Sequence, residues 1–297
     1  MAVVVVVAAV VVAAAAEDRV LKNEKILSGC GVGWRPQLAM HIERRKDLKF
    51  IEVLADNHFM ETSRYPAIES LQKRGIKVAL HAIGLSLCGS NLPDCAYIDS
   101  LNRLIDLYGA VCISEHLAFV RGGGLESGHL LPVKRDDATL KVVVENINFA
   151  AKRLNASLVL ENIASYLTWP GETMDEAEFL SRILAETDCR LLLDISNLYA
   201  NASNLGFSPE AFLDRLPLSK VAYMHIAGGE KRKGIYHDTH AHDMDEAVVE
   251  LLETALLKGC TDAVLLERDD QFPDLSGFNK ELDQIARALS ARQLANV

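Results

Sequence analysis

Short apolar runs alternate with longer amphipathic stretches along the chain from residue 27 onward. Continuous apolar runs are typical of parallel strands that are buried on both faces of a sheet. They predict eight strands, at residues 28–34, 49–54, 77–81, 110–114, 157–160, 189–193, 220–224 and 262–266. Because these strands alternate with helical stretches, we expect an α/β protein with a (β/α)8 TIM barrel, and a doubly wound open sheet is the alternative.

Helical spacing of apolar residues marks the segments between the strands. The predicted helices cover residues 36–46, 66–74, 94–108, 136–154, 176–185, 243–257 and 276–291. Thr173 and Glu176 have the spacing of a capping box, and Ser208 before Pro209 predicts the start of a further helix. A long loop at 117–133 contains the glycines 122–124, and we expect it either to cover the site or to form a flexible hairpin.

Length and charge limit the class of protein. The chain has 297 residues, of which 49% are hydrophobic and 24% charged. Because α/β barrels of this length form single domains, we expect one catalytic barrel domain at residues 27–297. The formal net charge is −10, and the longest basic run covers only 231–233. A nucleic-acid partner is therefore not expected, because phosphate binding requires a basic face.

The first 26 residues form a segment apart from the barrel. Residues 2–16 are only alanine and valine, lack the positive start of a secretory signal and are too few to span a bilayer comfortably. We interpret 1–26 as an extension outside the fold: an upstream start, a weak export signal or a segment that binds a partner. The six cysteines form no Cys-x-x-Cys pair, which favours a cytoplasmic protein without a membrane contact, and we assign none of them to metal.

From the second strand onward, each predicted strand ends in polar side chains, most of which can bind a metal. They are Glu52, Asn57, His58, His81, Glu115, His116, Glu161, Asn162, Asp194, Asn197, His225, Asp238, His240, Glu267, Arg268 and Asp269. In TIM barrels the carboxyl ends of the strands carry the active site. Carboxylates and imidazoles that converge there would repel each other or stay unpaired without a cation. Because one zinc takes only three or four protein ligands, we expect two or three ions of iron, manganese or zinc.

The densest part of this pattern lies in residues 222–242. His225 ends the seventh strand, and the loop after it carries Asp238 and His240. In an extended loop these two side chains point the same way, because side chains alternate with a period of two. Together with His225 they suit a divalent metal, and a solvated polar loop is the alternative.

Short motifs follow one another in a fixed order between residues 31 and 269. They are Gly31-Val32-Gly33-Trp34-Arg35, Ile51-Glu52-Val53 with Asn57, His81-x-x-Gly-Leu-Ser, Ser114-Glu115-His116-Leu117, Leu130-Leu131-Pro132, Leu160-Glu161-Asn162, Leu192-Leu193-Asp194-x-x-Asn197, His225-Ile226-Ala227-Gly228, Asp238-Thr239-His240 and Leu266-Glu267-Arg268-Asp269. This ordered set resembles the DUF692 (UPF0276) family of multinuclear non-heme iron-dependent oxidases, which includes the methanobactin and 3-thiaglutamate biosynthesis oxidases.

The resemblance implies a xylose-isomerase-like TIM barrel that holds two or three iron ions in mixed Fe(II) and Fe(III) states. It implies an oxidase that modifies cysteine residues of a ribosomally synthesised precursor peptide with dioxygen, and a small partner protein that presents the peptide. By motif, the implied metal ligands are His81, His116, Glu161, Asp194, His225, Asp238, His240 and Glu267. One departure is Gly229, which stands where many members have a further histidine.

Other residues near the strand ends have candidate supporting roles. We expect a contact with substrate, or a role in holding the ligands, for Asn57, Glu115, Asn162, Asn197 and Arg268. For Asn162 and Asn197, capping of a helix is the alternative. Asp269 is the candidate catalytic residue, and it either accepts a proton or pairs with Arg268. We expect exposed or supporting positions for His58, His237 and His242.

Two other classes of function fit the same residues. One is a redox-silent metal enzyme on the same barrel, such as a sugar isomerase or a phosphodiesterase that uses zinc or manganese. The other is a non-enzymatic protein that stores metal or binds a precursor. Iron with charge-transfer absorption favours the oxidase, whereas zinc with full activity on a sugar or phosphoester favours the redox-silent enzyme.

Overall fold

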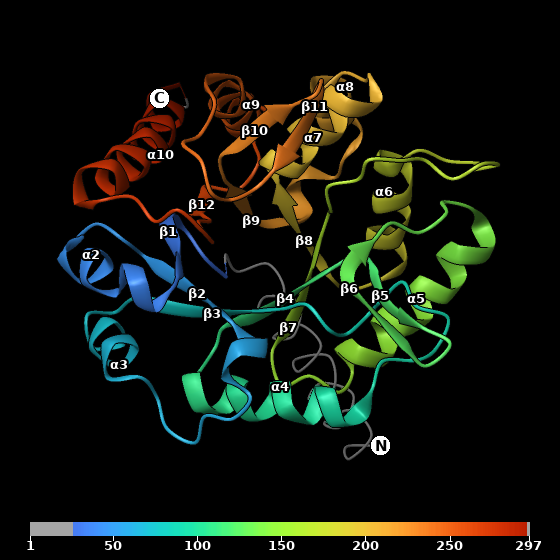
Figure 1. Ribbon diagram of the computed structural model, residues 1–297, viewed down its shortest axis with the longest axis horizontal. Helices are drawn as coiled ribbons and strands as arrows, with labels where there is room; N and C mark the ends of the chain where they lie inside the picture. Colours follow the sequence, from blue (N-terminus) through green and yellow to red (C-terminus); the bar gives the residue numbers. More distant parts are fainter. Residues whose placement is uncertain (1–25, 296–297) are drawn as a thin grey trace, which may run out of the picture.

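The computed structural model describes residues 26–295, and within them eight parallel strands close into a barrel (Figure 1). Around the barrel the strand order is β1, β12, β9, β8, β7, β4, β3 and β2. Their bounds are β1 Gly29–Trp34, β2 Phe50–Leu54, β3 Lys77–Ala82, β4 Cys112–His116, β7 Ser157–Glu161, β8 Arg190–Asp194, β9 Val221–Ile226 and β12 Ala263–Leu266. The predicted TIM barrel is confirmed, and the doubly wound alternative is wrong because β1 pairs with both β2 and β12.

The helices surround this barrel, with their apolar sides packed on the strands (Figure 1). They are α2 Ala39–Arg44, α3 Pro66–Lys73, α4 Cys95–Tyr108, α5 Asp137–Ala151, α6 Glu176–Glu186, α7 Ile195–Leu205, α8 Pro209–Arg215, α9 Glu246–Leu257 and α10 Leu275–Ala295. Short 3-10 turns cover Pro36–Leu38, Ala55–His58 and Leu218–Lys220. The predicted helix at 36–46 is therefore split into a 3-10 turn and the short helix α2.

Two helix starts differ from the sequence prediction. The first residue outside α6 is Asp175, whose side chain accepts a hydrogen bond from the Glu178 amide, so Thr173 is not the cap. The sequence also did not predict α7, which begins directly after β8 with Asp194 as its cap. Its sequence is rich in asparagine and serine, which have low helix propensity, and buried contacts of Asn201 hold it in place. The cap at Ser208 is confirmed.

The barrel interior is built in layers that follow the alternation of side chains along each strand. A lower apolar layer contains Phe50, Ala79, Cys112, Val159, Leu192, Tyr223 and Leu265. Two residues further along the strands, the same inward direction carries Glu52, His81, Ser114, Glu161, Asp194, His225 and Glu267. All seven of these polar side chains are buried. The apolar layer therefore forms the floor of a polar chamber at the carboxyl end of the barrel.

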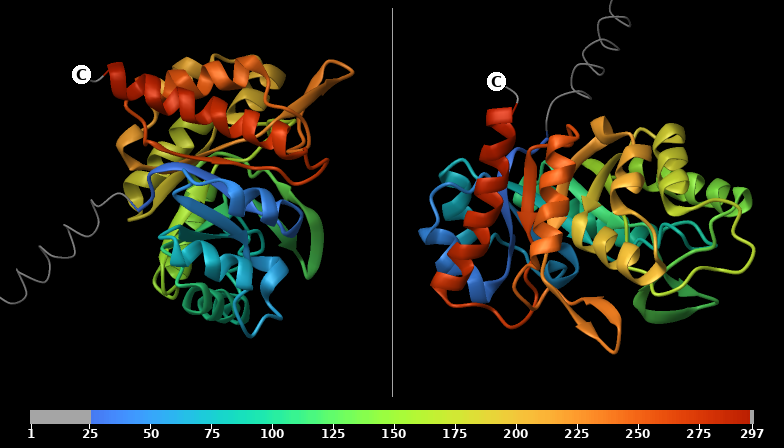
Figure 2. Two further views of the ribbon diagram at one scale, coloured as in Figure 1. Left: turned by 90° about the vertical axis from the view of Figure 1, so that its left-hand side faces the viewer. Right: turned by 90° about the horizontal axis from the view of Figure 1, so that it is seen from above.

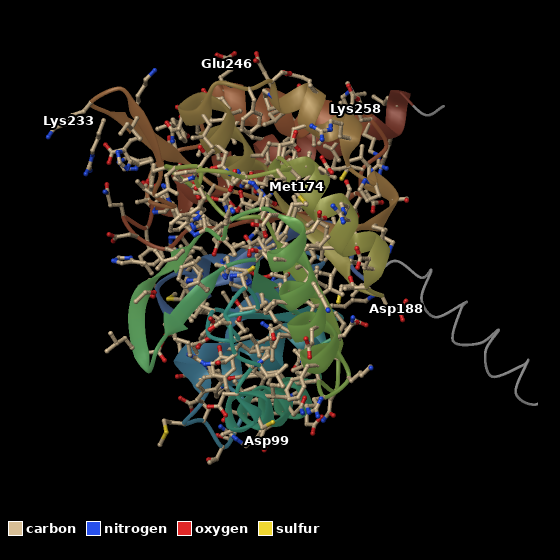
Figure 3. The ribbon with its side chains drawn as sticks, turned by 90° about the vertical axis from the view of Figure 1, so that its right-hand side faces the viewer. Asp99, Met174, Asp188, Lys233, Glu246 and Lys258 are labelled. Carbon is tan, nitrogen blue, oxygen red and sulfur yellow. The ribbon has the colours of Figure 1, made fainter. Side chains whose placement is uncertain are left out.

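Two antiparallel hairpins extend the loops at this end. The first is formed by β5 Phe119–Gly122 and β6 Leu125–Leu131, so the loop predicted at 117–133 is a hairpin. The second, β10 Gly229–Arg232 with β11 Ile235–Asp238, lies in the segment predicted as the loop after the seventh strand. Figure 2 shows both hairpins projecting from the same end of the barrel, and Figure 3 shows Lys233 at the tip of the second.

The predicted extension at 1–26 lies outside the described residues except for its last position. Among the residues that are described, no helix combines the length and the apolar character that crossing a membrane requires.

Loss of a core side chain on α10 is expected to destabilise the barrel. Phe278 has no exposed surface and its ring packs on His41 of α2, so Phe278→Ala leaves a cavity in the core beneath α10, which costs about 3–5 kcal/mol. Urea unfolding followed by circular dichroism measures this loss. The matched control is Leu294→Ala on the same helix, where the side chain is 79% exposed and the change is expected to stay within about 0.5 kcal/mol. Equal effects of the two substitutions would contradict this account of the α10 packing.

Candidate metal centre

The polar chamber brings together all eight side chains that the sequence motifs single out as ligands. They form three overlapping groups, and a fourth adds Asp269, with donor atoms within 4.8 Å of one another in each group. The groups are His81–His116–Glu161, Glu161–Asp194–His225–Glu267, Asp194–Asp238–His240 and His240–Glu267–Asp269. None of them contains a cysteine. Because neighbouring groups share carboxylates, the chamber forms one connected set rather than separate sites.

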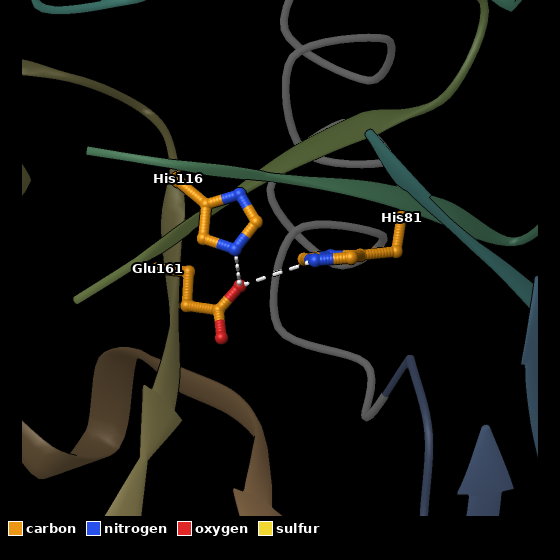
Figure 4. Close-up of side chains that lie close together, drawn as sticks. All are labelled: His81, His116 and Glu161. Atoms are coloured by element: carbon orange, nitrogen blue, oxygen red, sulfur yellow. Dashed lines mark ion pairs between the residues drawn. The ribbon is translucent and has the colours of Figure 1, made fainter. Parts of the chain in front are cut away.

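The register of the barrel creates the first group. Parallel pairing places His116 of β4 opposite Glu161 of β7, and His81 of β3 opposite Ser114 of β4. The Nε2 atoms of His81 and His116 lie 3.5 and 3.3 Å from the same Glu161 oxygen, Oε2. Figure 4 shows both imidazoles directed at that oxygen from different sides. Three donors that converge in this way could supply most of the protein ligands of one metal ion.

The second group shares Glu161 with the first. His225 of β9 pairs in register with Asp194 of β8. The His225 Nδ1 atom lies 3.3 Å from Glu161 Oε1, 3.1 Å from Glu267 Oε2 and 3.9 Å from Asp194 Oδ2. Glu161 therefore directs one oxygen to each group, so this carboxylate would be able to hold a cation in both.

The remaining two groups lie at the mouth of the chamber and share His240. Its Nε2 is 2.6 Å from Asp238 Oδ2, and its Nδ1 is 3.1 Å from Asp269 Oδ2. Asp238 and His240 meet as expected, but strand alternation is not the cause, because His240 adopts a left-handed conformation with φ of 50°. The Arg35 guanidinium donates to Asp269 Oδ1 from Nε at 3.0 Å and lies 3.6 Å from Glu267.

Several buried polar atoms in the chamber have no hydrogen-bond partner among the described residues. They are Glu161 Oε2, Asp194 Oδ2, Asp238 Oδ1 and both ring nitrogens of His225. His225 Nε2 does lie 3.0 Å from Glu52 Oε1, at ion-pair distance but with the ring turned from ideal alignment. An unpaired buried polar atom costs about 1–3 kcal/mol, so four side chains in this state indicate a missing partner. The chemistry of the donors, imidazole nitrogen and carboxylate oxygen, fits a cation such as iron, manganese or zinc.

Charge interactions in the chamber shift the protonation of its members. For His116, burial lowers the pKa, but the Glu161 and Glu115 carboxylates outweigh it and raise the pKa to about 9. For Asp194, burial and the neighbouring Asp238 and Glu161 charges raise the pKa to about 8. For Glu52, burial is outweighed by His225 and His81, and the pKa falls to about 2. Protons therefore take the place of metal ions in balancing this charge.

Two of the three asparagines among the predicted supporting residues, Asn162 and Asn197, hold Asp194. The Asn162 amide donates to the Asp194 carbonyl at 3.0 Å and accepts from the Asp194 amide at 2.9 Å. The Asn197 side chain donates from Nδ2 to the Asn162 backbone carbonyl. The Asn197 backbone N–H donates to Asp194 Oδ1 at 2.7 Å. Neither side chain caps a helix, since that role belongs to Asp194. Glu115 accepts from the amides of Leu85 and His116 and lies 3.3 Å from His116 Nδ1.

Other predicted residues are not brought to the chamber. Asn57 is exposed in the 3-10 turn after β2. Arg268 is buried near Glu281 of α10 and Asp243, so Asp269 pairs with Arg35 and His240 instead of Arg268. Outside the groups lie His58, which contacts Tyr108, His237, which contacts Tyr166, and His242, which contacts Thr239.

The backbone at Gly229 leaves no space for the additional histidine that the resemblance implied at this position. A Cβ atom at this position would lie 2.5 Å from the His237 carbonyl oxygen and 2.6 Å from the Tyr236 ring. A histidine here would therefore require a different path of the β10–β11 hairpin.

Sequence reasoning did not assign a role to four residues that touch the ligands. Glu52 and Ser114 contact His225 and His81 respectively, and the Tyr223 hydroxyl lies between them. The fourth is Arg35 at the mouth. For Glu52, Ser114 and Tyr223, the signal was available in the period of two, because each lies on the inward face of its strand.

A cavity of about 370 Å³ opens onto the chamber. Its lining contains His81, His116, Glu161, Asp238, His240, Glu267 and Asp269, together with Arg35, Leu130 and Asn197. A larger cavity, of about 600 Å³, lies beside α6, α7 and α8 and contains none of these ligands. The smaller cavity is therefore the one that can admit a substrate to the centre.

Removal of His240 is expected to lower the metal content while the barrel stays folded. His240→Ala deletes a donor at the mouth, whereas the first two groups keep every member. Metal analysis and circular dichroism on the same sample measure this. The matched control is His237→Ala, which lies three residues away and outside the groups and is expected to keep all of its metal. Unchanged metal per chain in His240→Ala would remove this residue from the ligands.

Metal binding is expected to release protons and to strengthen as the pH rises. With pKa values of about 9 and about 8, His116 and Asp194 hold protons at neutral pH in the metal-free chain. A cation must displace these protons, so affinity should increase between about pH 6 and pH 9. Calorimetry in buffers of different ionisation enthalpy counts the released protons. An affinity that falls with rising pH over this range would contradict the assignment.

The sequence of this chain is similar to a known protein family and to individual proteins. The model of a family described as RiPP precursor modification enzyme MbnB/TglH/ChrH matches residues 29–290, where RiPP denotes a ribosomally synthesised and post-translationally modified peptide. A UPF0276 protein of Streptomyces avermitilis is 38% identical over 272 residues, which cover 88% of this chain and 55% of that protein. The chain thus spans about half the length of this relative. A UPF0276 protein of Bordetella bronchiseptica is 36% identical over 271 residues, covering 89% of this chain and 93% of that protein.

Among solved structures, a xylose isomerase domain containing protein from Salmonella typhimurium is similar with a TM-score of 0.60, at 13% identity, over 91% of this chain and 98% of that chain. At this identity the likeness shows the fold, which is the xylose-isomerase-like TIM barrel. With the family model matching most of its length and relatives above 30% identity, the chain belongs to the RiPP precursor modification enzymes of the MbnB/TglH/ChrH family, whose relatives here are named UPF0276 proteins.

Proposed function

We propose that this enzyme is a multinuclear iron-dependent oxidase that modifies cysteine residues of its precursor peptide with dioxygen. The sharing of Glu161, Asp194, His240 and Glu267 between neighbouring groups supports the proposal most directly. A single hydrolytic zinc needs three or four protein ligands, whereas this chamber offers eight that the motifs single out, and Asp269 besides. Two or three ions, bridged by carboxylates, account for that surplus.

The donor set favours iron for redox chemistry on a sulfur substrate. All donors in the groups are imidazole nitrogens or carboxylate oxygens, and the protein contributes no thiolate. The six cysteines are not needed there: none belongs to the metal groups, Cys112 lies in the apolar floor beneath the chamber, and Cys30, Cys88, Cys189 and Cys260 are buried elsewhere in the fold. The imidazoles and carboxylates of the groups would hold the iron, which would supply affinity for the substrate thiolate and redox chemistry with dioxygen.

The residues at the mouth orient the substrate and handle its proton. Asp269 is 42% exposed, whereas Glu161, Asp194 and Glu267 are nearly or fully buried, so Asp269 is the carboxylate that an incoming thiol meets first. It is our candidate to accept the thiol proton. Arg35 and His240 hold its two oxygens and thereby fix its direction.

The rim of the cavity includes the loop after β7, whose residues Ile163 and Ala164 line the cavity, and the exposed part of this loop is suited to contact a peptide. Tyr166, Leu167 and Trp169 are 41–54% exposed in the loop after β7. The Trp169 indole donates to the Pro132 carbonyl at the end of β6, and Tyr166 contacts His237 of β11, so this loop spans the distance between the two hairpins. Exposed aromatic side chains are typical of protein and peptide contacts. We further propose that a small partner protein presents the precursor at this rim.

Dioxygen consumption should depend on the cysteine of the precursor. With iron partly ferrous, the enzyme is expected to consume dioxygen and change the peptide mass when given a cysteine-containing precursor and its presenting protein. A precursor with serine in place of that cysteine should support neither, because the serine hydroxyl stays protonated and binds iron poorly. An oxygen electrode and mass spectrometry of the peptide measure the two outcomes.

The same assay tests the alternatives. Mass change under strict anaerobiosis, or equal uptake with the serine peptide, would contradict the oxidase and favour a redox-silent metal enzyme. Full turnover of a short free cysteine peptide would contradict the presenting partner but leave the oxidase in place. The enzyme control is Leu294→Ala on α10, an exposed position outside the metal groups and the rim, which is expected to keep its metal and its uptake.

A further inference from the structure

We propose that Glu52 is a positioning residue that fixes the ring tautomers of two ligand histidines, His225 and His81, which belong to different metal groups. The inference rests on the metal centre of the proposed function, but it depends neither on iron nor on oxidation. A single buried carboxylate would then determine which ring nitrogen is available to a metal in two different groups.

Glu52 lies on the inward face of β2, is 3% exposed and belongs to none of the four groups. Each of its oxygens faces a different partner. Oε1 is 3.0 Å from His225 Nε2, and Oε2 is 2.6 Å from the Tyr223 hydroxyl. An ionised carboxylate can only accept hydrogen bonds, so the Tyr223 hydroxyl donates to it, whereas its contact with His225 is an ion-pair distance without hydrogen-bond alignment.

The branch to His225 acts through charge at short distance. Because the Glu52 carboxylate lies 3.0 Å from Nε2, it favours the tautomer of neutral His225 that carries the proton on Nε2 and the lone pair on Nδ1, although the ring is turned from hydrogen-bond alignment. Nδ1 is the atom that faces Glu161 at 3.3 Å and Glu267 at 3.1 Å, where a cation of the second group would bind. A carboxylate behind a ligand histidine is a common way to orient the ring and strengthen the bond to the metal.

The branch to His81 runs through two hydroxyl groups. Tyr223 has a single proton, which it donates to Glu52, so its oxygen can only accept from Ser114 Oγ at 2.8 Å. With its own proton directed to Tyr223, Ser114 accepts from His81 Nδ1 at 2.7 Å. The lone pair of His81 therefore lies on Nε2, which faces Glu161 Oε2 at 3.5 Å in the first group.

Every proton in this network thus points toward Glu52, from His81 through Ser114 and Tyr223 on one side and from His225 on the other. Loss of the carboxylate removes the acceptor on which both branches end, and it leaves Ser114 Oγ with the Leu80 carbonyl oxygen, at 3.3 Å, as an alternative acceptor. Loss of the Tyr223 hydroxyl interrupts the His81 branch alone. This asymmetry distinguishes a positioning role from a general contribution to folding.

The test uses the full chain, stripped of metal and reloaded with Co²⁺, whose visible absorption reports its coordination. Tyr223→Phe is expected to weaken Co²⁺ binding at the first group by about 10–100-fold, the usual effect of losing such a supporting partner. Glu52→Gln keeps the shape of the side chain but turns one acceptor into a donor, and it is expected to weaken binding at both groups. Chelator competition measures affinity and the number of ions per chain.

The decisive comparison is made in a His81→Ala background, which lacks the first branch's ligand. There, Tyr223→Phe is expected to have no further effect, whereas Glu52→Gln still weakens the remaining ions through His225. The control is Tyr108→Phe, which removes the hydroxyl of another fully buried tyrosine, one that contacts His58 outside the groups. Circular dichroism confirms that each variant is folded.

Two results would overturn the inference. One is a wild-type affinity in both Tyr223→Phe and Glu52→Gln. The other is an equal effect of Tyr223→Phe with and without His81, since that result indicates a structural role. Because Co²⁺ binding needs no dioxygen, an enzyme that binds Co²⁺ in the expected pattern but consumes no dioxygen contradicts the proposed function alone.

Discussion

The burial of carboxylates and imidazoles against one another at the carboxyl end of the barrel is the constraint that the rest of the structure satisfies. Glu161, Asp194 and His225 have almost no exposed surface, so water cannot solvate their charges. Burial of an ion without a partner is costly, and the pairs in this chamber offset one another only while the barrel register holds them in place. The asparagines at 162 and 197, the α7 cap and the hydroxyl network all serve to hold that register.

The barrel and most of the chamber could be predicted from the sequence because both follow local patterns. Apolar runs mark the strands, and the residues that end them must converge once the strands are parallel. The positions of His81, His116 and Glu161 at the ends of predicted strands were enough to place them at the carboxyl end of the barrel. By contrast, α7 was missed, because its stability comes from buried side-chain contacts such as those of Asn201 rather than from helix propensity.

Contacts between distant strands were beyond a local pattern. Tyr223 and Glu52 are separated by 171 positions and meet only because β9 and β2 face each other across the closed barrel. Arg268 was predicted near the centre from its place beside Glu267, yet it is buried toward α10, since adjacent residues project in opposite directions. The left-handed turn at His240 likewise has no signal in residue type, because histidine only occasionally adopts it.

The β10–β11 hairpin combines two parts with different freedom to change. Its tip, at Lys233 and Gly234, is exposed, while its last residue, Asp238, is a member of the metal groups and is followed by His240. The composition of the tip can therefore drift during evolution, because no ligand depends on it. Its length in residue pairs cannot, since Gly229 pairs with Asp238, and an unpaired insertion would turn the carboxylate out of the chamber. The tip of the hairpin could therefore come to contact different partners while Asp238 and His240 keep their positions in the metal groups.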